Sequence, residues 1–292
     1  MKIETRKLEP FGLELHIPQK IAWDALQPQQ LLKWLSEHRV LVVRGLQPLD
    51  STELVEAAKS FGPIQYWSFG AINHLRVSED AKNYLFTNRE VPLHWDGAFA
   101  EECPHILFFQ CLETSEETGG ETYFVDTTSV LKAATPQQIG RWSKQSYQYT
   151  TEAIAHYGGS FTAPLVQRAP KSGEPILRFA EPVNDLNPVE VKPVSDDVDE
   201  GRQVMETLSK RLHRSEYKLT HRWKTGDIVI ADNDLLLHGR NAFTDSATRY
   251  IQRVNILREK QPSQKAQVSP PDSNVQNGHA QPAPRSHQHI YR

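Results

Sequence analysis

The chain alternates short β-like runs with a few stretches of helical periodicity. In residues 28–35 the apolar side chains recur at the spacing of one helix face, whereas 39–45 is a β-branched run that ends at a glycine. Asp50 or Ser51 suits the N-cap of a further helix over 53–62. The opening part of the chain therefore predicts a helix, a strand and a helix, in that order.

Strand signals dominate the remainder of the chain. Strands are predicted at 106–112, 121–125, 225–231 and 249–257, a hairpin at 164–168 and 175–179, and helices at 136–144 and 199–214. Many strands, few helices and no repeated β-α-β alternation in the centre favour a mainly β fold with flanking helices. Such a fold is either a β-sandwich or a jelly roll.

Composition excludes several classes of protein. The 292 residues include 33 Lys and Arg against 36 Asp and Glu, a near-balance that argues against nucleic-acid binding. No apolar run reaches the length of about 18 residues that a membrane span needs. The N-terminus lacks the apolar stretch of a secretory signal, so we expect a cytoplasmic protein. Two cysteines allow neither a disulfide framework nor a thiolate zinc site.

The last part of the chain differs in composition from the rest. Residues 261–292 are rich in Pro, Gln, Ser and Asn and poor in apolar side chains. Such a segment cannot bury enough surface to offset the entropy that ordering costs. We therefore expect a single domain over residues 1–260 and a disordered tail after it.

The segment Pro92–Gly97 carries the first candidate chemistry. His94 and Asp96 are two residues apart, and in an extended segment such residues point to the same side. One imidazole and one carboxylate suit a divalent iron ion. A histidine held by a neighbouring aspartate at a strand end is the structural alternative.

His238 is the candidate for a third metal ligand. It follows three leucines and precedes Gly239, which permits close backbone approach. A buried imidazole needs a partner, because an unpaired polar group is costly in an apolar environment. Metal ligation and a backbone hydrogen bond would both satisfy this requirement.

Arg249 and Arg253 lie four residues apart in a predicted strand and therefore share a face. Two inward-facing arginines are costly without an anion, and guanidinium groups match carboxylates in a bidentate fork. A small dicarboxylic acid beside the metal would satisfy both. The alternative is a pair of surface arginines on an edge strand.

Together these residues resemble a known family. The matching elements, in order, are His94-x-Asp96, Gly119-Gly120-Glu121-Thr122, Gly226-Asp227, Asp232-Asn233, His238, Arg249 and Arg253. This order, over residues 25–258, resembles the TauD/TfdA family of Fe(II)- and 2-oxoglutarate-dependent dioxygenases. The resemblance implies a double-stranded β-helix core, which is a cupin-like jelly roll.

The resemblance also implies roles for individual residues. His94, Asp96 and His238 would hold Fe(II), leaving positions for 2-oxoglutarate and O₂. The Thr122 hydroxyl would help to hold 2-oxoglutarate. Arg253 would grip the distal carboxylate of 2-oxoglutarate, and the second arginine, Arg249, would lie near its other carboxylate. An intact Asp96 disfavours halogenation.

One branch of the family looks most similar. The segments VPLHWDGAFAEECPHILFFQC, LLLHGRNAF and RYIQRVNILRE resemble the PvcB-like oxygenases of isonitrile biosynthesis. That resemblance implies desaturation or hydroxylation of a small carboxylate derived from an amino acid, an isonitrile from tyrosine, in secondary metabolism. Arg240, Asn88, Tyr66 and Phe161 are candidates for contacts with this substrate. A structural salt bridge for Arg240 and core packing for the aromatic residues are the alternatives.

Two other functions stay open at this point. One is a TauD/TfdA-type oxygenase that acts on a sulfonate or an aryloxy acid. The other is a metal-binding β-barrel protein without catalytic activity. The arginine pair argues against the second, because a metal site alone needs no clamp for a dicarboxylate.

Overall fold

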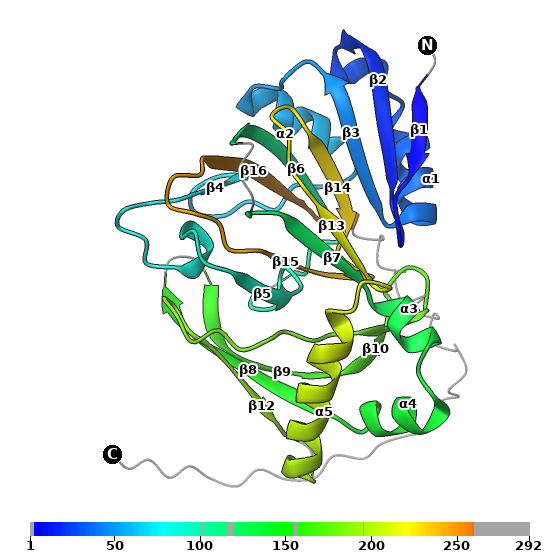
Figure 1. Cartoon of the computed structure of the whole chain (residues 1–292), viewed down its shortest axis with the longest axis vertical. Coiled ribbons are helices and arrows are strands. Elements are labelled where there is room, and N and C mark those ends of the chain that lie inside the picture. The colour runs from blue at the N-terminus through cyan, green and yellow to red at the C-terminus, as the bar shows by residue number, and fades with distance from the viewer. Residues whose placement is uncertain (1–2, 101, 116–118, 155–156, 195, 260–292) are drawn as a thin grey trace, which may run out of the picture. The chain divides into compact units, whose positions relative to one another are not determined.

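The structure is a computed structural model that describes residues 3–100, 102–115, 119–154, 157–194 and 196–259 (Figure 1). The predicted tail falls in residues 260–292, which lie outside the described residues, so the tail and the domain boundary before it stay predictions. None of the helices in the described part of the chain has the length and apolar character needed to span a bilayer.

Antiparallel pairing organises most of the strands into two large sheets (Figure 1). The seven-stranded sheet has the order β1 (Glu4–Lys7), β2 (Leu13–Ile21), β3 (Val40–Leu46), β14 (Ile228–Asp232), β6 (Ile106–Thr114), β16 (Arg249–Ile256) and β4 (Ile72–Arg76). The four-stranded sheet has the order β13 (Lys218–His221), β7 (Thr122–Asp126), β15 (Leu236–Arg240) and β5 (Val91–His94).

Two smaller sheets and several helices surround this pair. The small sheets contain β12 (Val189–Pro193), β8 (Ser146–Ile154) and β9 (Tyr157–Pro164), and β10 (Val166–Arg168) with β11 (Pro175–Leu177). The helices are α1 (Pro28–His38), α2 (Ser51–Lys59), α3 (Thr127–Lys132), α4 (Pro136–Trp142) and α5 (Val198–Leu212), with 3₁₀ turns at Trp23–Ala25 and Tyr84–Phe86.

The alternation of side chains along β6 explains why the two large sheets pack face to face. Ile106 and Phe108 belong to the core under α1 and α2, whereas Leu107 and Phe109 belong to a second core. That second core also takes Phe124 from β7 of the four-stranded sheet. Because successive side chains in a strand point to opposite faces, one apolar run fills both cores.

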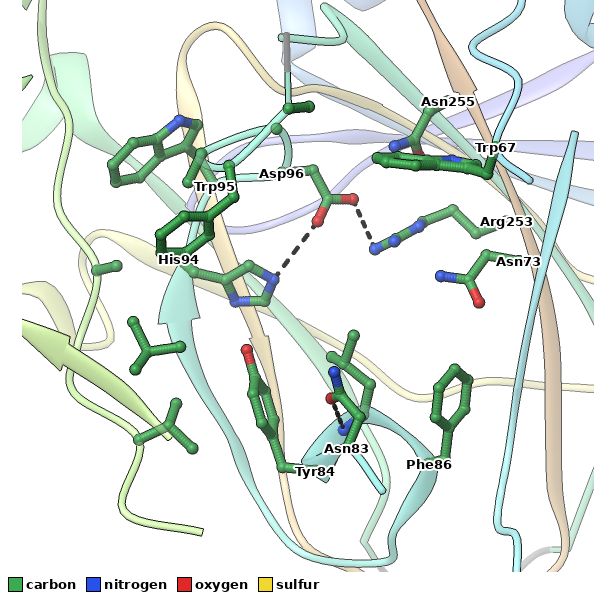
Figure 2. A pocket seen from close by; sticks show the side chains of 18 of the residues that line it. Trp67, Asn73, Asn83, Tyr84, Phe86, His94, Trp95, Asp96, Arg253 and Asn255 are labelled. Atoms are coloured by element: carbon green, nitrogen blue, oxygen red, sulfur yellow. Dashed lines mark hydrogen bonds and ion pairs between the residues drawn. The ribbon is translucent and has the colours of Figure 1, made fainter. Parts of the chain in front are cut away.

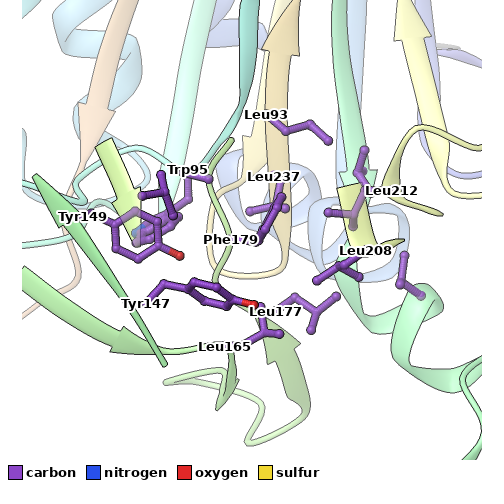
Figure 3. Close-up of a cluster of buried hydrophobic side chains, with 14 of the residues drawn as sticks. Leu93, Trp95, Tyr147, Tyr149, Leu165, Leu177, Phe179, Leu208, Leu212 and Leu237 are labelled. Atoms are coloured by element: carbon purple, nitrogen blue, oxygen red, sulfur yellow. The ribbon is translucent and has the colours of Figure 1, made fainter. Parts of the chain in front are cut away.

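The outer face of the four-stranded sheet covers a third core (Figure 3). Leu93 and Leu237 from this sheet pack there with Tyr147 from β8 and Leu208 from α5. The layers therefore follow in the order α1 and α2, the seven-stranded sheet, the four-stranded sheet, and then α5 with the three-stranded sheet. The paired antiparallel sheets at the centre are the predicted jelly roll.

Most predicted elements are confirmed within a few residues. Asp50 is the N-cap of α2 and forms a capping box with Glu53, since each accepts a hydrogen bond from the backbone of the other. The predicted hairpin is the β10–β11 pair. The pattern did not predict β15 or the three-stranded sheet. All five residues of β15, Leu-Leu-His-Gly-Arg, are buried, so apolar and polar residues do not alternate between a core face and a solvent face, and the strand shows no period of two.

We expect Phe108→Ala to lower the free energy of unfolding by about 3–5 kcal/mol. Phe108 is fully buried, and its ring lies 5.2 Å from that of Trp23 and 5.8 Å from that of Phe61. Denaturant unfolding would measure the change. Val77→Ala, at a residue that is 49% exposed, should change the stability by less than about 0.5 kcal/mol. Equal effects of the two substitutions would contradict this account of the core.

Candidate metal centre

Strand pairing brings the two candidate histidines together. His94 is the last residue of β5, and His238 lies opposite it in β15. Asp96 follows two residues after His94, where the chain leaves the sheet. The predicted separation of two residues therefore places His94 and Asp96 on the same side of the chain, facing His238 from the neighbouring strand.

The three side chains form one cluster (Figure 2). Asp96 Oδ1 lies 3.6 Å from Nε2 of His94 and 3.9 Å from Nε2 of His238, and the candidate ligand atoms all lie within 4.8 Å of one another. Ligand atoms that bind one ion at about 2 Å lie about 3 Å apart, so small side-chain rotations suffice to surround a metal. The residues present therefore fit a divalent ion.

Both histidines are prepared for ligation. His94 Nδ1 lies 2.9 Å from the carbonyl oxygen of Pro92, and a proton on Nδ1 satisfies this contact and leaves Nε2 free as a ligand. Burial, together with the nearby His94, lowers the pKa of His238 to about 3. His238 is therefore neutral at physiological pH, as a metal ligand must be.

Asp96 carries the negative charge of the cluster. Burial alone would raise the pKa of its carboxyl group, but the charge of Arg253, with smaller contributions from the two neighbouring histidines, outweighs burial and holds the pKa well below its usual range. Arg253 Nη1 lies 2.6 Å from Asp96 Oδ2. The carboxylate is therefore ionised and charge-compensated inside the protein.

A buried asparagine that was not predicted as functional fixes the Asp96 loop. Asn233 Oδ1 accepts from the Asp96 backbone N–H at 3.1 Å, and its Nδ2 donates to the carbonyl oxygens of Asp96, at 2.9 Å, and Pro104, at 2.7 Å. The Asp232-Asn233 pair was part of the family resemblance, but without a role. Asn233 positions the loop and does not touch the candidate ion.

Gly239 allows the close approach to the backbone that the sequence predicted. A Cβ added at this position would lie 2.5 Å from the ring of Tyr123, which crosses over the glycine from the neighbouring strand. No larger residue fits there without moving Tyr123. Because Gly239 follows His238 directly, this packing also fixes the backbone of a candidate ligand.

The two predicted arginines occupy separate positions on one face of β16. Arg249 donates from Nε to the carbonyl oxygen of Gly120 at 2.9 Å and from Nη2 to Thr122 Oγ1 at 3.3 Å. Burial lowers the pKa of Arg249 to about 9. Thr122 Oγ1 also accepts from Trp223 Nε1 at 2.9 Å. Arg249 and Thr122 thus form one buried unit, while Arg253 lies beside Asp96.

Two cavities meet at the cluster. The larger has a volume of about 840 Å³, and much of its wall is aromatic, including Tyr84, Phe86 and Phe99. The smaller, of about 40 Å³, is lined by Thr122, His94, His238, Arg249 and Arg253 among others. His94 and Arg253 belong to both walls. A bound metal would therefore lie next to a small cavity that contains two arginines and a large cavity with aromatic walls.

Arg240 has a structural role in place of the predicted contact with a substrate carboxylate. Its guanidinium group donates to the backbone carbonyl oxygens of Leu85, at 3.1 Å, and of Thr87 and Arg89, each at 2.6 Å. These partners are neutral carbonyls, and no salt bridge of Arg240 is present among the described residues. Arg240 fixes the segment that precedes β5, because its Nη donors are occupied there.

The other three predicted substrate contacts lie outside the wall of the large cavity. Tyr66 is 65% exposed, and the Asn88 amide donates to Asp245. Phe161 stacks on Tyr149 at 5.0 Å and lies behind the wall that Tyr149 lines. Neighbouring residues line the cavity instead. A single sequence did not distinguish these neighbours, because loop conformation decides which side chain turns inward.

Comparison with known proteins agrees with this geometry. Residues 4–255 match the family described as taurine catabolism dioxygenase TauD, TfdA family. The chain belongs to this family. The family resemblance found in the sequence is thereby confirmed, and so is the jelly-roll fold, since the solved structures it superposes on have the same architecture.

Two curated relatives and one solved structure are particularly similar. The chain is 41% identical to the 3-((Z)-2-isocyanoethenyl)-1H-indole synthase of Fischerella ambigua, over 88% of this chain and 96% of the relative. It is 36% identical to the tyrosine isonitrile desaturase of Pseudomonas aeruginosa, over 80% and 82%. The crystal structure of PvcB from Pseudomonas aeruginosa superposes with a TM-score of 0.74 at 31% identity, over 87% of this chain and 91% of that one.

We expect Asn233→Leu to weaken divalent-metal binding by about 10–100-fold, because the Asp96 loop loses its clamp. Titration of the metal-free protein with Fe(II) or Mn(II) under anaerobic conditions would measure the affinity. Gln110→Leu is the matched control, since Gln110 clamps the backbone of Leu49 through both ends of its amide on the other side of the large sheet. Equal losses of affinity in both variants would mean that Asn233 matters only for general stability.

Proposed function

We propose that the protein is an Fe(II)- and 2-oxoglutarate-dependent oxygenase that desaturates an isonitrile derived from an aromatic amino acid. The observation that carries the proposal is the His94–Asp96–His238 cluster between a small arginine-lined cavity and a large aromatic cavity. A related structure is described as PvcB, an Fe, alpha-ketoglutarate dependent oxygenase from an isonitrile synthetic pathway.

His94, Asp96 and His238 would hold the iron, and their chemistry matches the two-histidine, one-carboxylate set that leaves positions open on the ion. Fe(II) with 2-oxoglutarate and O₂ supplies the oxidant: 2-oxoglutarate becomes succinate and CO₂, the substrate loses two hydrogen atoms, and one water forms. The protein's residues position the substrate and exclude bulk water from the site.

The contacts favour an assignment of the arginines opposite to the one that the family resemblance implied. Arg249 and Thr122 form a buried donor unit in the small cavity, away from Asp96. This unit suits the distal carboxylate of 2-oxoglutarate, which needs charge-assisted hydrogen bonds from a fixed fork. Arg253 instead lies against a metal ligand, where it balances Asp96 and attracts the anionic group nearest the ion.

The large cavity supports an aromatic substrate. Its wall includes Trp95, which stacks edge-on against Tyr149 at 5.3 Å, and Phe99. Aromatic walls favour flat apolar ligands. An isonitrile from tyrosine fits this description and the Pseudomonas relative. An isonitrile from tryptophan is the second candidate, because the relative with an indole product has 41% identity over 96% of its length.

The alternatives kept open by the sequence are less well supported. If the protein only bound a metal, the buried Arg249–Thr122 unit beside the cluster would have no function. The 2,4-dichlorophenoxyacetate dioxygenase of Cupriavidus pinatubonensis, a relative that acts on an aryloxy acid, is only 23% identical. Desaturation is favoured over hydroxylation, because the similar protein from Pseudomonas aeruginosa is a tyrosine isonitrile desaturase.

We expect the protein with Fe(II) and 2-oxoglutarate, without O₂, to show the weak visible charge-transfer band of a bound 2-oxo acid. Adding tyrosine- or tryptophan-derived isonitrile and O₂ should then yield one succinate per desaturated product. Asp96→Ala should abolish both the band and turnover. A band without coupled product would keep the cosubstrate and reject the isonitrile, and the absence of a band under full iron loading would reject the oxygenase.

Arg249→Leu should raise the apparent KM for 2-oxoglutarate by about 10–100-fold, because the distal carboxylate loses a charged donor. Arg253→Leu, the matched substitution four residues along the same strand, should raise this KM much less and should strengthen Fe(II) binding, because it removes a positive charge that competes with the ion for Asp96. Steady-state kinetics and metal titration measure the two effects. If Arg253→Leu alone raised the KM for 2-oxoglutarate, the first assignment of the arginines would be restored.

A further inference from the structure

Four charged side chains besides the histidines lie in the described wall of the large cavity. They are Lys82, Asp96, Glu181 and Arg253. Asp96 and Arg253 compensate each other in their ion pair beside the candidate metal centre (Figure 2). Glu181 and Lys82 remain, and the partners of each side chain decide what it can offer to a ligand.

The Glu181 carboxylate is satisfied by the protein itself. Its Oε2 accepts from the backbone N–H of Leu93 at 3.0 Å. Its Oε1 accepts from the Ser209 hydroxyl and lies 2.9 Å from Nε2 of His213. Both oxygens therefore have donors from the protein, and Glu181 is a structural anion in the cavity wall.

Lys82 has no comparable partner. It is exposed, and it forms neither a salt bridge nor a side-chain hydrogen bond with any described residue. Lys82 nevertheless lines the large cavity, so a ligand in the cavity can reach it. An ammonium group is a compact charge on a flexible stem, with three donors for an anion. Lys82 is thus the cation of the described wall that the protein leaves uncompensated.

The segment that carries Lys82 also supplies part of the aromatic wall. Tyr84 and Phe86 follow Lys82 closely in the chain, and both rings line the same cavity (Figure 2). Asn83 fixes the backbone of this segment, because its Oδ1 accepts from the backbone N–H of Leu85 at 2.9 Å. One fixed segment therefore presents a cation and two aromatic rings to a ligand in the cavity.

We propose that Lys82 binds the carboxylate of the substrate while the aromatic ring of the substrate packs in the wall that includes Tyr84 and Phe86. The inference rests on the proposed function and specifies how that site selects its substrate. An isonitrile derived from an amino acid keeps one carboxylate, which is its only net charge. Lys82 therefore discriminates against a neutral isonitrile that carries the same ring.

The test compares the isonitriles derived from tyrosine and from tyramine, which differ by one carboxylate. Calorimetry without O₂ uses the full chain loaded with Fe(II) and 2-oxoglutarate. Wild type should bind the tyrosine compound about 5–20-fold more tightly than the tyramine compound. Lys82→Met and Lys82→Gln should each bring this ratio close to one and leave the binding of 2-oxoglutarate unchanged. Lys82→Arg should keep most of the preference, because it keeps the charge.

Lys33→Met is the matched control. Lys33 is an exposed lysine of α1, beyond the seven-stranded sheet, so this variant removes the same charge far from the cavity and should keep the preference.

Equal affinity of wild type for the two compounds would overturn the role of Lys82 even if its variants failed to fold. An unchanged ratio in Lys82→Met would also overturn it, because the carboxylate would then be held elsewhere. An equal loss of preference in Lys33→Met would mean that only the net charge of the protein matters. If neither isonitrile binds while 2-oxoglutarate does, it is the proposed function that fails.

Discussion

The ion pair between Asp96 and Arg253 is the interaction on which the site depends. A buried carboxylate between two imidazoles is stable only with a counter-charge, and Arg253 supplies it at 2.6 Å. Asp96 follows β5 of the four-stranded sheet, whereas Arg253 lies on β16 of the seven-stranded sheet. The pair therefore bridges the two sheets of the jelly roll at the candidate metal centre, and any change in their packing changes the ligand geometry.

Strand β16 places several residues of the site one after another along its length. Its inward face carries Arg249, Arg253 and Asn255, and its outward face packs Val254 under the helices. The two guanidinium groups would serve different anionic groups, because Arg249 is paired with Thr122 and Arg253 with Asp96. Under the proposed function, the cosubstrate and the metal would lie beside successive positions along this strand. A strand that is paired on both sides, as β16 is with β6 and β4, holds such positions better than a loop does.

The sequence predicted what depends on local periodicity. The shared face of Arg249 and Arg253 follows from a period of two, and the same rule places His94 and Asp96 together. Those predictions needed no knowledge of other strands. The hydrogen bonds of Asn233 and Arg240 could not be predicted, because their partners are backbone carbonyls that only the folded chain brings near. A single sequence contains no periodic signal for such contacts, and the cavity lining depends on loops in the same way.

Two buried asparagines near the site are held by the protein to different extents. Asn233 uses both ends of its carboxamide on the Asp96 loop and on Pro104, so it has nothing left to offer a ligand. Asn255 uses only its amino end, on Gln65. Burial and residue type are the same, and the difference lies in which atoms the protein itself satisfies. Asn233 is therefore fully committed to holding the loop of the candidate metal ligand, whereas the Asn255 side chain is tied to the protein at one end only.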